Sequence, residues 1–407
     1  MGGDKLIATR VEQHIIRKPN RLWGVADKNC YLSKNLYNFA NFYVRQSFIS
    51  DGYWLRSSEM EKTFKTSDPY KELMSQPSQQ TLKMLDAAWK SFFVAIKDWK
   101  KNPQKYLGRP NLPRYLPKDG RYTWSIKNNG CRIRNGRLEF VIKRLSKVSI
   151  PTKARGRLLC VRFVPKGTCY VMEIVTEVEV PEQPIGEPNR IAGIDLGVNN
   201  LVTVANNIGL MPIIVNGKGI KAINQFYNKR KARIQSELMI RNGSKKSKRL
   251  EEMAFKRFCC IKTKFHQTSR MIVDYCVANH IDTLVCGLNK GWKQEINTGR
   301  QNNQRFSSIP YDMLIKQLAY KCEDSGIRFT TVEEAYTSGT SALDGEQPTK
   351  ENYDKSRRVK RGLFKWSGGF VNADVNAACQ IIKKVSPNAF ADGVGAEDLQ
   401  PAILNIA

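Results

Sequence analysis

The pattern of hydrophobic and polar positions divides the first 182 residues into three textures. Residues 5–17 alternate and predict a β-strand. Residues 79–100 repeat large apolar side chains at intervals of three and four, which predicts an amphipathic helix that ends before Pro103. From 107 to 182, prolines and glycines separate short apolar runs, which favours a small β-barrel. The aromatic residues of the helix are therefore interpreted as core.

Beyond a proline-rich segment at 181–189, the main expected domain boundary, the pattern becomes more regular. The expected elements are, in order, three short strands at 191–196, 201–205 and 211–215, two long basic helices, a strand at 281–287, a helix at 309–325, a strand at 327–333 and a final helix that begins in the sequence NADVNAACQIIKK. A meander of three strands followed by alternating helix and strand is the order of the ribonuclease H-like fold. We therefore expect a multidomain protein that combines α+β and α/β parts.

The charge balance indicates a polyanionic partner. The 407 residues carry 67 Lys and Arg against 37 Asp and Glu, a net charge of +30. Nucleic acid is the commonest partner for such an excess, because its binding releases counterions. No apolar stretch is long enough for a membrane span, and the first residues do not form a signal peptide. We expect no membrane and no small-molecule substrate.

The cysteines do not predict a metal site. No two of the ten are separated by two residues, and the sequence has only three histidines. A zinc ribbon needs closely spaced pairs of such ligands, so we expect no zinc and reduced thiols.

Basic and aromatic positions that the pattern leaves off the core are candidates for contact with nucleic acid. Solvated helix faces and mobile loops are the alternative interpretation of the same residues. The candidates are Lys97, Lys101, Arg109, Arg114, Arg121, Tyr122, Lys229, Arg230, Arg233, Lys245, Lys246, Lys248, Arg357 and Arg358.

Two aspartates are candidates for catalysis. Asp195 interrupts an apolar strand, where a carboxylate is costly unless a positive charge compensates it. Asp374 lies at the start of the final helix, where the alternative is a helix-capping role. Together they could form two sides of a site for two Mg²⁺ ions about 4 Å apart, which hydrolyse phosphodiesters.

Four segments resemble TnpB, the family of transposon-encoded RNA-guided nucleases related to type V CRISPR effectors and Fanzor. They are GIDLGVNNLVTV, YDMLIKQLAYKCEDSGI, EEAYTS and NADVNAACQI. The resemblance implies a guide RNA from the transposon end, a double-stranded DNA target beside a short adjacent motif, and two Mg²⁺ ions that Mn²⁺ can replace.

The resemblance also implies a domain layout. A helical recognition domain would span 21–105, and a wedge barrel would combine 1–20 with 106–182. A linker at 183–189 would precede a RuvC nuclease domain of ribonuclease H-like fold. That domain would comprise 190–337 and the last helix at 371–390, interrupted by a basic insert at 338–370 in place of a zinc ribbon and followed by a tail at 391–407.

The sequence departs from this family in two places. Cys286 and Gly287 stand where the second RuvC motif should supply a glutamate, and Ser341 and Gly345 stand where ribbon cysteines are expected. The replacement glutamate could be one of Glu295, Glu333 and Glu334. We favour Glu334, because strand ends converge on the active site in this fold; the alternative is a solvated strand end.

Three functions are compatible with these features. The first is an RNA-guided, magnesium-dependent DNA endonuclease that uses Asp195, Glu334 and Asp374. The second is a nuclease-dead, RNA-guided repressor, which the missing glutamate would explain. The third is a DDE-type transposase, which would need a glutamate rather than Asp374 on the final helix. A bacterial protein would act in the cytoplasm at the nucleoid, and a eukaryotic one in the nucleus.

Overall fold

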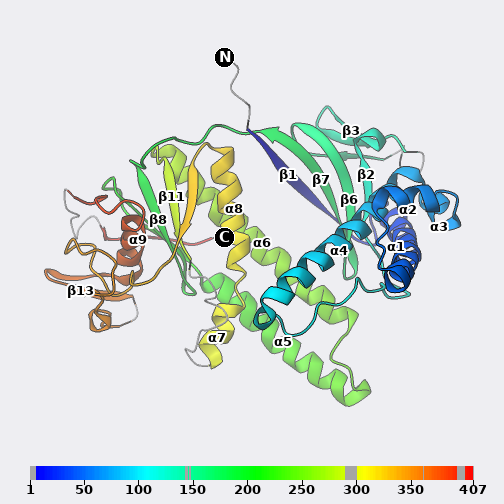
Figure 1. Ribbon diagram of the computed structural model, residues 1–407. Helices are drawn as coiled ribbons and strands as arrows, with labels where there is room; N and C mark the ends of the chain where they lie inside the picture. Colours follow the sequence, from blue (N-terminus) through cyan, green and yellow to red (C-terminus); the bar gives the residue numbers. More distant parts are fainter. Residues whose placement is uncertain are drawn as a thin grey trace. The chain divides into compact units, whose positions relative to one another are not determined.

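The computed structural model describes residues 6–142, 145, 148–288, 300–360, 362–391 and 399–406. Contacts between residues divide the chain into two compact units (Figure 1). One comprises Ile7–Glu179, and the other joins Met1–Leu6 to Val180–Ala407. The division falls beside the proline-rich segment. None of the helices within the described ranges combines the length and apolarity that a membrane span requires.

Helices form one side of the first unit. They are α1 (Trp23–Asp51), α2 (Ser57–Phe64), α3 (Asp68–Leu73), α4 (Ser75–Lys101) and a short 3-10 turn, η1 (Pro103–Lys105). The predicted helix at 79–100 is confirmed within α4. It begins earlier, because Pro77 fits the first turn of a helix. Trp89 is fully buried and donates a hydrogen bond to Asn41 Oδ1 at 3.1 Å, which joins α4 to α1.

Two antiparallel sheets complete the first unit. One has the order β1-β7-β6-β2, and the other the order β3-β4-β5. Their strands are β1 (Ile7–Ile16), β2 (Trp124–Lys127), β3 (Cys131–Arg134), β4 (Arg137–Phe140), β5 (Ser149–Pro151), β6 (Arg157–Lys166) and β7 (Cys169–Glu179), with the turn η2 (Asn128–Gly130) between β2 and β3. In the described residues the two sheets are separate ladders, so the closed barrel stays a prediction.

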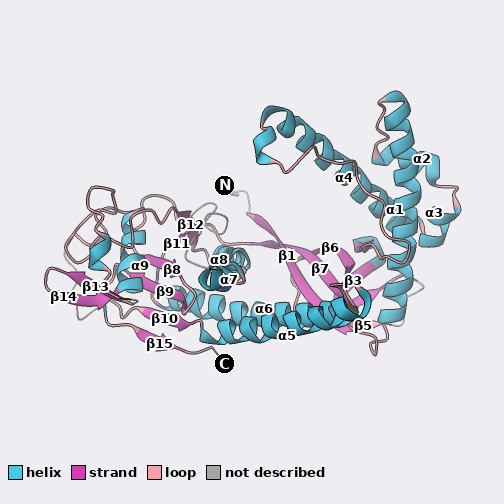
Figure 2. Cartoon of the chain, turned by 90° about the horizontal axis from the view of Figure 1, so that it is seen from below, coloured by secondary structure: helices cyan, strands magenta, loops and turns pink. Residues whose placement is uncertain are grey.

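A six-stranded sheet is the centre of the second unit, in the order β12-β11-β8-β9-β10-β15 (Figure 2). Its strands are β8 (Ile191–Leu196), β9 (Asn200–Asn206), β10 (Ile213–Asn216), β11 (Thr283–Gly287), β12 (Arg328–Val332) and β15 (Ala402–Leu404). The strands β8, β9 and β10 form an antiparallel meander, and β11 and β12 run parallel to β8. The five strands predicted for this region are confirmed, and β15 was not predicted.

Helices cover both faces of this sheet, and α8 and α9 lie on opposite sides of it (Figure 1). The helices are α5 (Lys218–Asn242), α6 (Lys248–Ala278), α7 (Arg300–Ser307), α8 (Tyr311–Asp324) and α9 (Ala373–Lys383); a turn η3 (Lys355–Arg357) and a hairpin of β13 (Leu363–Trp366) and β14 (Gly369–Asn372) precede α9.

The alternation of β8 decides which face Asp195 joins. Ala192 and Ile194 belong to the core cluster that includes residues of α6 and α8, whereas Ile191 packs with Ile381 of α9. Gly193 lies so close to α9 that a Cβ would stand 2.4 Å from the carbonyl oxygen of Ala378. Since alternate side chains share a face, Asp195 lies on the α9 side of the sheet.

Candidate active site

Asp195 lies where a negative charge is disfavoured. It is the fifth residue of β8 and keeps only partial access to solvent. Desolvation raises its pKa well above the ordinary value, and the nearby charges of Asp374 and Glu334 raise it further, while Arg358 acts in the opposite direction. The two predicted partners of Asp195 are therefore close enough to interact with it electrostatically.

Glu334 follows the end of β12, and its position explains the missing glutamate. A Cβ on Gly287 would stand 2.6 Å from Glu334 Cγ and 2.6 Å from its Oε1. The Glu334 side chain thus fills the space that a side chain at 287 would occupy, on the neighbouring strand β11. Because Gly287 has no side chain, a carboxylate can enter from β12 instead.

The two adjacent glutamates differ as alternation along the strand predicts. Glu333 is exposed, whereas Glu334 is half-buried, and desolvation raises the pKa of Glu334 to about 7. Tyr336 adopts a left-handed conformation with φ 68°, and Thr337 donates through its N–H and hydroxyl to the Glu334 carbonyl oxygen at 3.2 and 2.9 Å. This turn fixes the backbone that presents Glu334.

Asp374 lies in the first turn of α9 but does not cap it. The cap is Asn372, whose Oδ1 accepts hydrogen bonds from the N–H groups of Asp374 and Val375 at 3.0 and 3.2 Å. The Asp374 carboxylate instead accepts from Asn200 Nδ2 at 2.7 Å and from Arg358 Nη2 at 3.1 Å. The sequence did not single out Asn200, although this first residue of β9 lies only five positions after Asp195.

The turn between β8 and β9 is held from α8. The hydroxyl of Tyr311, the first residue of α8, donates to the carbonyl oxygen of Gly197 at 2.8 Å. Gly197 has no room for a Cβ, which would stand 2.5 Å from the Asn200 carbonyl oxygen. The tight turn brings Asn200 to Asp374 beside the end of β8.

These residues fit a hard divalent cation in chemistry, though not as a preformed cage. Asp195, Glu334 and Asp374 offer carboxylate oxygens, which Mg²⁺ prefers. Desolvation raises the pKa of Asp195 most, and repulsion from Asp374 and Glu334 raises it further. A divalent cation would relieve that repulsion. Within the described part of the chain, however, no three acidic, histidine or cysteine side chains are gathered at metal-binding distances. Arg358 supplies the positive charge at Asp374. The third candidate, Glu295, lies outside the described residues.

A network of charges and amides organises the segment where ribbon cysteines were expected. Arg357 Nη1 lies 2.8 Å from Glu346 and 3.7 Å from Asp344, and its Nε lies 4.0 Å from Asp354. One guanidinium therefore joins three carboxylates from separate positions of the segment.

Helix α9 supports the same segment with side chains. Asn376 donates to the Thr340 carbonyl oxygen and accepts from the Ala342 N–H, at 2.8 and 2.9 Å. Lys383 Nζ donates to the carbonyl oxygen of Gly345 at 2.7 Å. These contacts link the segment to the helix that carries Asp374.

Arg357→Met should loosen this segment. Three carboxylates would lose their shared counter-charge, so we expect the free energy of local opening at 338–357 to fall by about 1–3 kcal/mol. Hydrogen exchange of these backbone amides measures the change. Lys355→Met removes the same charge from an exposed neighbouring side chain and is the matched control. Equal acceleration by both variants would show that the Arg357 network does not hold the segment.

The candidate nucleic-acid residues have two kinds of environment. Lys97, Lys101, Arg109, Arg114, Lys245, Lys246 and Lys248 are exposed. Arg121 instead pairs with Asp27 through two hydrogen bonds of 2.9 and 3.1 Å, and the ring of Tyr122 lies 4.7 Å from that of Tyr37. The side chains of Arg121 and Tyr122 are thus engaged in contacts within the protein.

Three candidates on α5 lie together. Lys229, Arg230 and Arg233 line a cavity of about 510 Å³, to which Arg249 of α6 also contributes. Glu237 also lines the cavity and pairs with Arg233 at 2.9 Å, so the lining is basic on balance. Its chemistry suits an anionic backbone.

Comparisons with known proteins find two matching family models and several similar proteins. The family described as OrfB_IS605, probable transposase, matches residues 173–293, and the Cas12f1-like TNB domain matches 311–381. A CRISPR-associated endodeoxyribonuclease Cas12f1 of Sulfoacidibacillus thermotolerans is 26% identical over 211 residues, which are 49% of this chain and 47% of that protein. The chain thus spans about half the length of this relative.

One further relative and one solved structure cover more of the chain. The putative RNA-guided DNA endonuclease InsQ of Escherichia coli K12 is 25% identical over 77% of this chain and 75% of its own. The cryo-EM structure of a Cas12f1–sgRNA–target DNA complex has a protein of similar fold, with a TM-score of 0.57 at 14% identity over 88% of this chain and 82% of that one. The resemblance to TnpB-like nucleases is confirmed.

Proposed function

We propose that this protein is an RNA-guided DNA endonuclease of the transposon-encoded type, with a RuvC active site on a ribonuclease H-like sheet. The observation that carries the proposal is that the charges of Asp374, on α9, and Glu334, after β12, act on Asp195 near the end of β8. The matches to Cas12f1 and InsQ support the nuclease class and the RNA-guided mode. The wedge barrel, the adjacent motif and the origin of the guide at the transposon end are parts of the same proposal.

The three carboxylates would hold two Mg²⁺ ions, which when bound supply activation of water and stabilisation of the leaving oxygen. The chain's own residues prepare this site. Asn200 and Arg358 orient Asp374, and the partial exclusion of solvent around Asp195 strengthens electrostatic interactions there. Arg358 is exposed enough to turn from Asp374 to a phosphate of the substrate when a cation occupies the site.

The two alternative functions, a repressor and a transposase, differ from the nuclease in the carboxylates that they require. A nuclease-dead repressor would need no carboxylate at the position of Glu334, yet Gly287 leaves space that this side chain fills. A DDE-type transposase would need a glutamate on the last helix, where this chain has Asp374. The geometry favours the nuclease over both.

Sequencing the RNA that copurifies with the full chain tests the guided mode. We expect one RNA species of defined length that includes transposon-end sequence. A random sample of cellular RNA would reject guidance and leave an unguided nuclease.

The basic cavity between α5 and α6 should contribute to the salt dependence of RNA binding. We expect the logarithm of the association constant to fall with the logarithm of salt concentration with a slope steeper than about −3. Arg230→Ala with Arg249→Ala should make the slope shallower by about two, because each arginine neutralises about one phosphate. Titrations at several salt concentrations measure this.

The control removes two arginines that are already paired. Arg132 and Arg157 form ion pairs with Glu139 and Glu177, so Arg132→Ala with Arg157→Ala should leave the slope unchanged. A slope shallower than −3 in the wild type, unaffected by Arg230→Ala with Arg249→Ala, would contradict a binding role for this cavity.

A further inference from the structure

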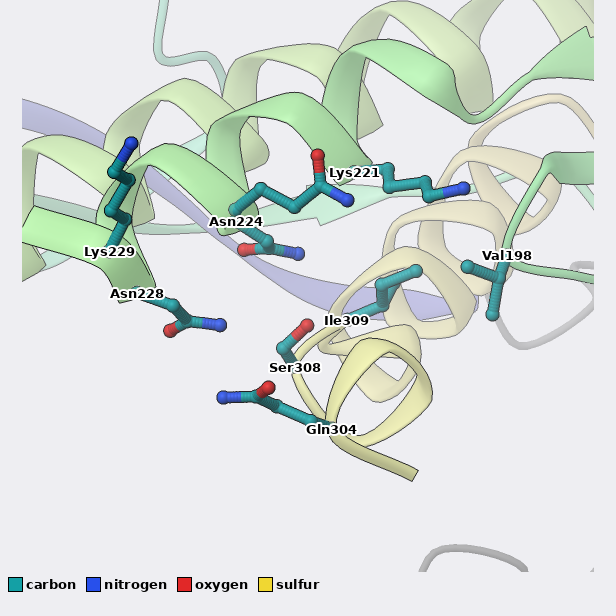
Figure 3. Close-up of a pocket in the computed structure, with 9 residues that line it drawn as sticks. Val198, Lys221, Asn224, Asn228, Lys229, Gln304, Ser308 and Ile309 are labelled. Carbon is teal, nitrogen blue, oxygen red and sulfur yellow. The ribbon is translucent and has the colours of Figure 1, made fainter. Parts of the chain in front are cut away.

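A second cavity, of about 350 Å³, lies between α5, the end of α7 and the turn that follows β8 (Figure 3). Its volume falls within the usual range for small-ligand sites, about 300–1,000 Å³. Its described polar lining consists of four carboxamides, two lysines and one serine: Lys221, Asn224, Gln225, Asn228, Lys229, Gln304 and Ser308. Val198 and Ile309 add apolar surface.

This lining matches the chemistry of a nucleobase better than that of a simple anion. Carboxamides present donors and acceptors side by side, as the edges of bases do. A site for phosphate alone would be lined mainly by lysines and arginines. The side chains of Asn224 and Asn228 on α5 face Ser308 and Gln304 across the cavity, so donors and acceptors converge from two helices (Figure 3).

Asn224 is the strongest indication of a ligand. It is only 4% exposed, and its Oδ1 accepts a hydrogen bond from Arg257 Nε at 2.7 Å. Arg257 is itself fixed, because its Nη2 donates to the Ser308 carbonyl oxygen at 2.6 Å and its guanidinium lies 5.0 Å from the ring centre of Tyr227.

Fixing Oδ1 also fixes the other end of the amide. Among the described residues, Asn224 Nδ2 has no hydrogen-bond partner. A buried donor without an acceptor destabilises a fold, and such groups are rare unless a ligand or water satisfies them. A base that enters the cavity would bring an acceptor to this amide.

We propose that this cavity binds one unpaired nucleotide of a nucleic-acid strand. The base would lie against Val198 and Ile309 with its edge toward Asn224 and Asn228, and its phosphate near Lys221 and Lys229. The turn that contributes Val198 leads directly into Asn200, the first residue of β9, which donates a hydrogen bond to Asp374. A strand anchored here would be positioned beside the carboxylates. Binding needs neither a divalent cation nor cleavage, so the proposal goes beyond the nuclease reaction.

The test separates contacts to bases from contacts to the backbone. Full-length protein freed of nucleic acid is titrated, in the presence of EDTA, with fluorescein-labelled dT12, rU12 and an abasic 12-mer, and anisotropy gives the affinities. The wild type should bind the strands with bases more tightly than the abasic strand. Asn228→Ala with Gln304→Ala should reduce this preference by about fivefold, through lost hydrogen bonds to the base. Neither side chain is buried, so the fold should persist.

Two further variants sharpen the test. Asn224→Asp keeps the oxygen that accepts from Arg257 but removes the buried donor, and it should also reduce the preference for bases. The control, Asn242→Ala with Gln267→Ala, removes two exposed carboxamides of α5 and α6 outside the cavity. It should leave the preference for strands with bases unchanged.

The titrations with dT12 and with rU12 show whether the cavity binds DNA or RNA. A reduced preference with dT12 alone assigns the cavity to DNA, with rU12 alone to RNA, and with both to an unpaired nucleotide of either strand. An unchanged preference in both the Asn228→Ala, Gln304→Ala variant and the Asn224→Asp variant would overturn the proposal.

Discussion

Asp195→Asn should abolish DNA cleavage, with a loss of about a thousandfold or more, while guide RNA and target DNA still bind. The substitution keeps the shape of the side chain and removes one charge from three carboxylates that would hold the cations. If Asp195 is a metal ligand, its loss should affect ion placement rather than the nucleic-acid contacts, which are proposed on other residues. Cleavage of a labelled target and a gel-shift titration of the same variant measure the two effects.

The stability of this variant provides an internal control. The folded-state pKa of Asp195 is raised, so the wild type is favoured while this group is protonated and loses that stability as pH rises through the folded pKa. Asparagine does not titrate. In EDTA, Asp195→Asn should therefore gain thermal stability relative to the wild type as pH rises from acid. A variant that cleaves at the wild-type rate would exclude Asp195 from the site.

Glu334→Gln should reduce cleavage by about a hundredfold or more. In the proposed two-cation site, two aspartates alone would leave the cations short of ligands, and Gly287 offers none. Glu333→Gln is the matched control, because the neighbouring glutamate is exposed and undergoes the same chemical change. It should alter the rate by less than about threefold. An essential Glu333 would place the other face of this strand end in the site, and no effect from either would favour the repressor.

Moving the third carboxylate from Glu334 to position 287 on β11 tests whether Glu334 replaces the glutamate that is missing from β11. A Cβ at 287 collides with the Glu334 side chain, and the Cδ1 of Ile381 lies 2.6 Å from the same point. Gly287→Glu alone should therefore damage the site. Combined with Glu334→Ala, which vacates the space, it should recover part of the lost cleavage if Ile381 changes its rotamer. No recovery, in a variant that still binds DNA, would mean that the two positions are not equivalent.

Local patterns were sufficient to predict most of the second unit. The alternation and apolar runs of β8, β9, β11 and β12 are properties of adjacent residues, as is the 3.6-residue period of α8. The strand β15 has only three residues, and its parallel pairing with β10 depends on a partner nearly two hundred residues away. The hairpin of β13 and β14 was likewise missed, because it lies within a segment whose basic composition suggested a loop.

Some features of the candidate site could be predicted from local sequence patterns, and others depend on contacts between distant parts of the chain. A carboxylate in an apolar strand marked Asp195, and alternation separated Glu334 from Glu333. The Glu334 side chain occupies space that is open only because Gly287, on another strand, has no side chain. The contacts of Arg357 with its three carboxylates join separate positions in a segment that contains only the short turn η3. Such relations depend on tertiary packing, which a single sequence pattern does not encode.

The most direct test of the central claim is cleavage of a defined DNA by the protein bound to its copurified RNA. A plasmid library carrying the sequence complementary to that RNA, flanked by randomised bases, is incubated with the complex and Mg²⁺. We expect cuts at the matched sequence beside a short common motif, none in EDTA and none with Asp195→Asn. Equal cutting of unmatched plasmids, or undiminished cutting by Asp195→Asn, would contradict the central claim.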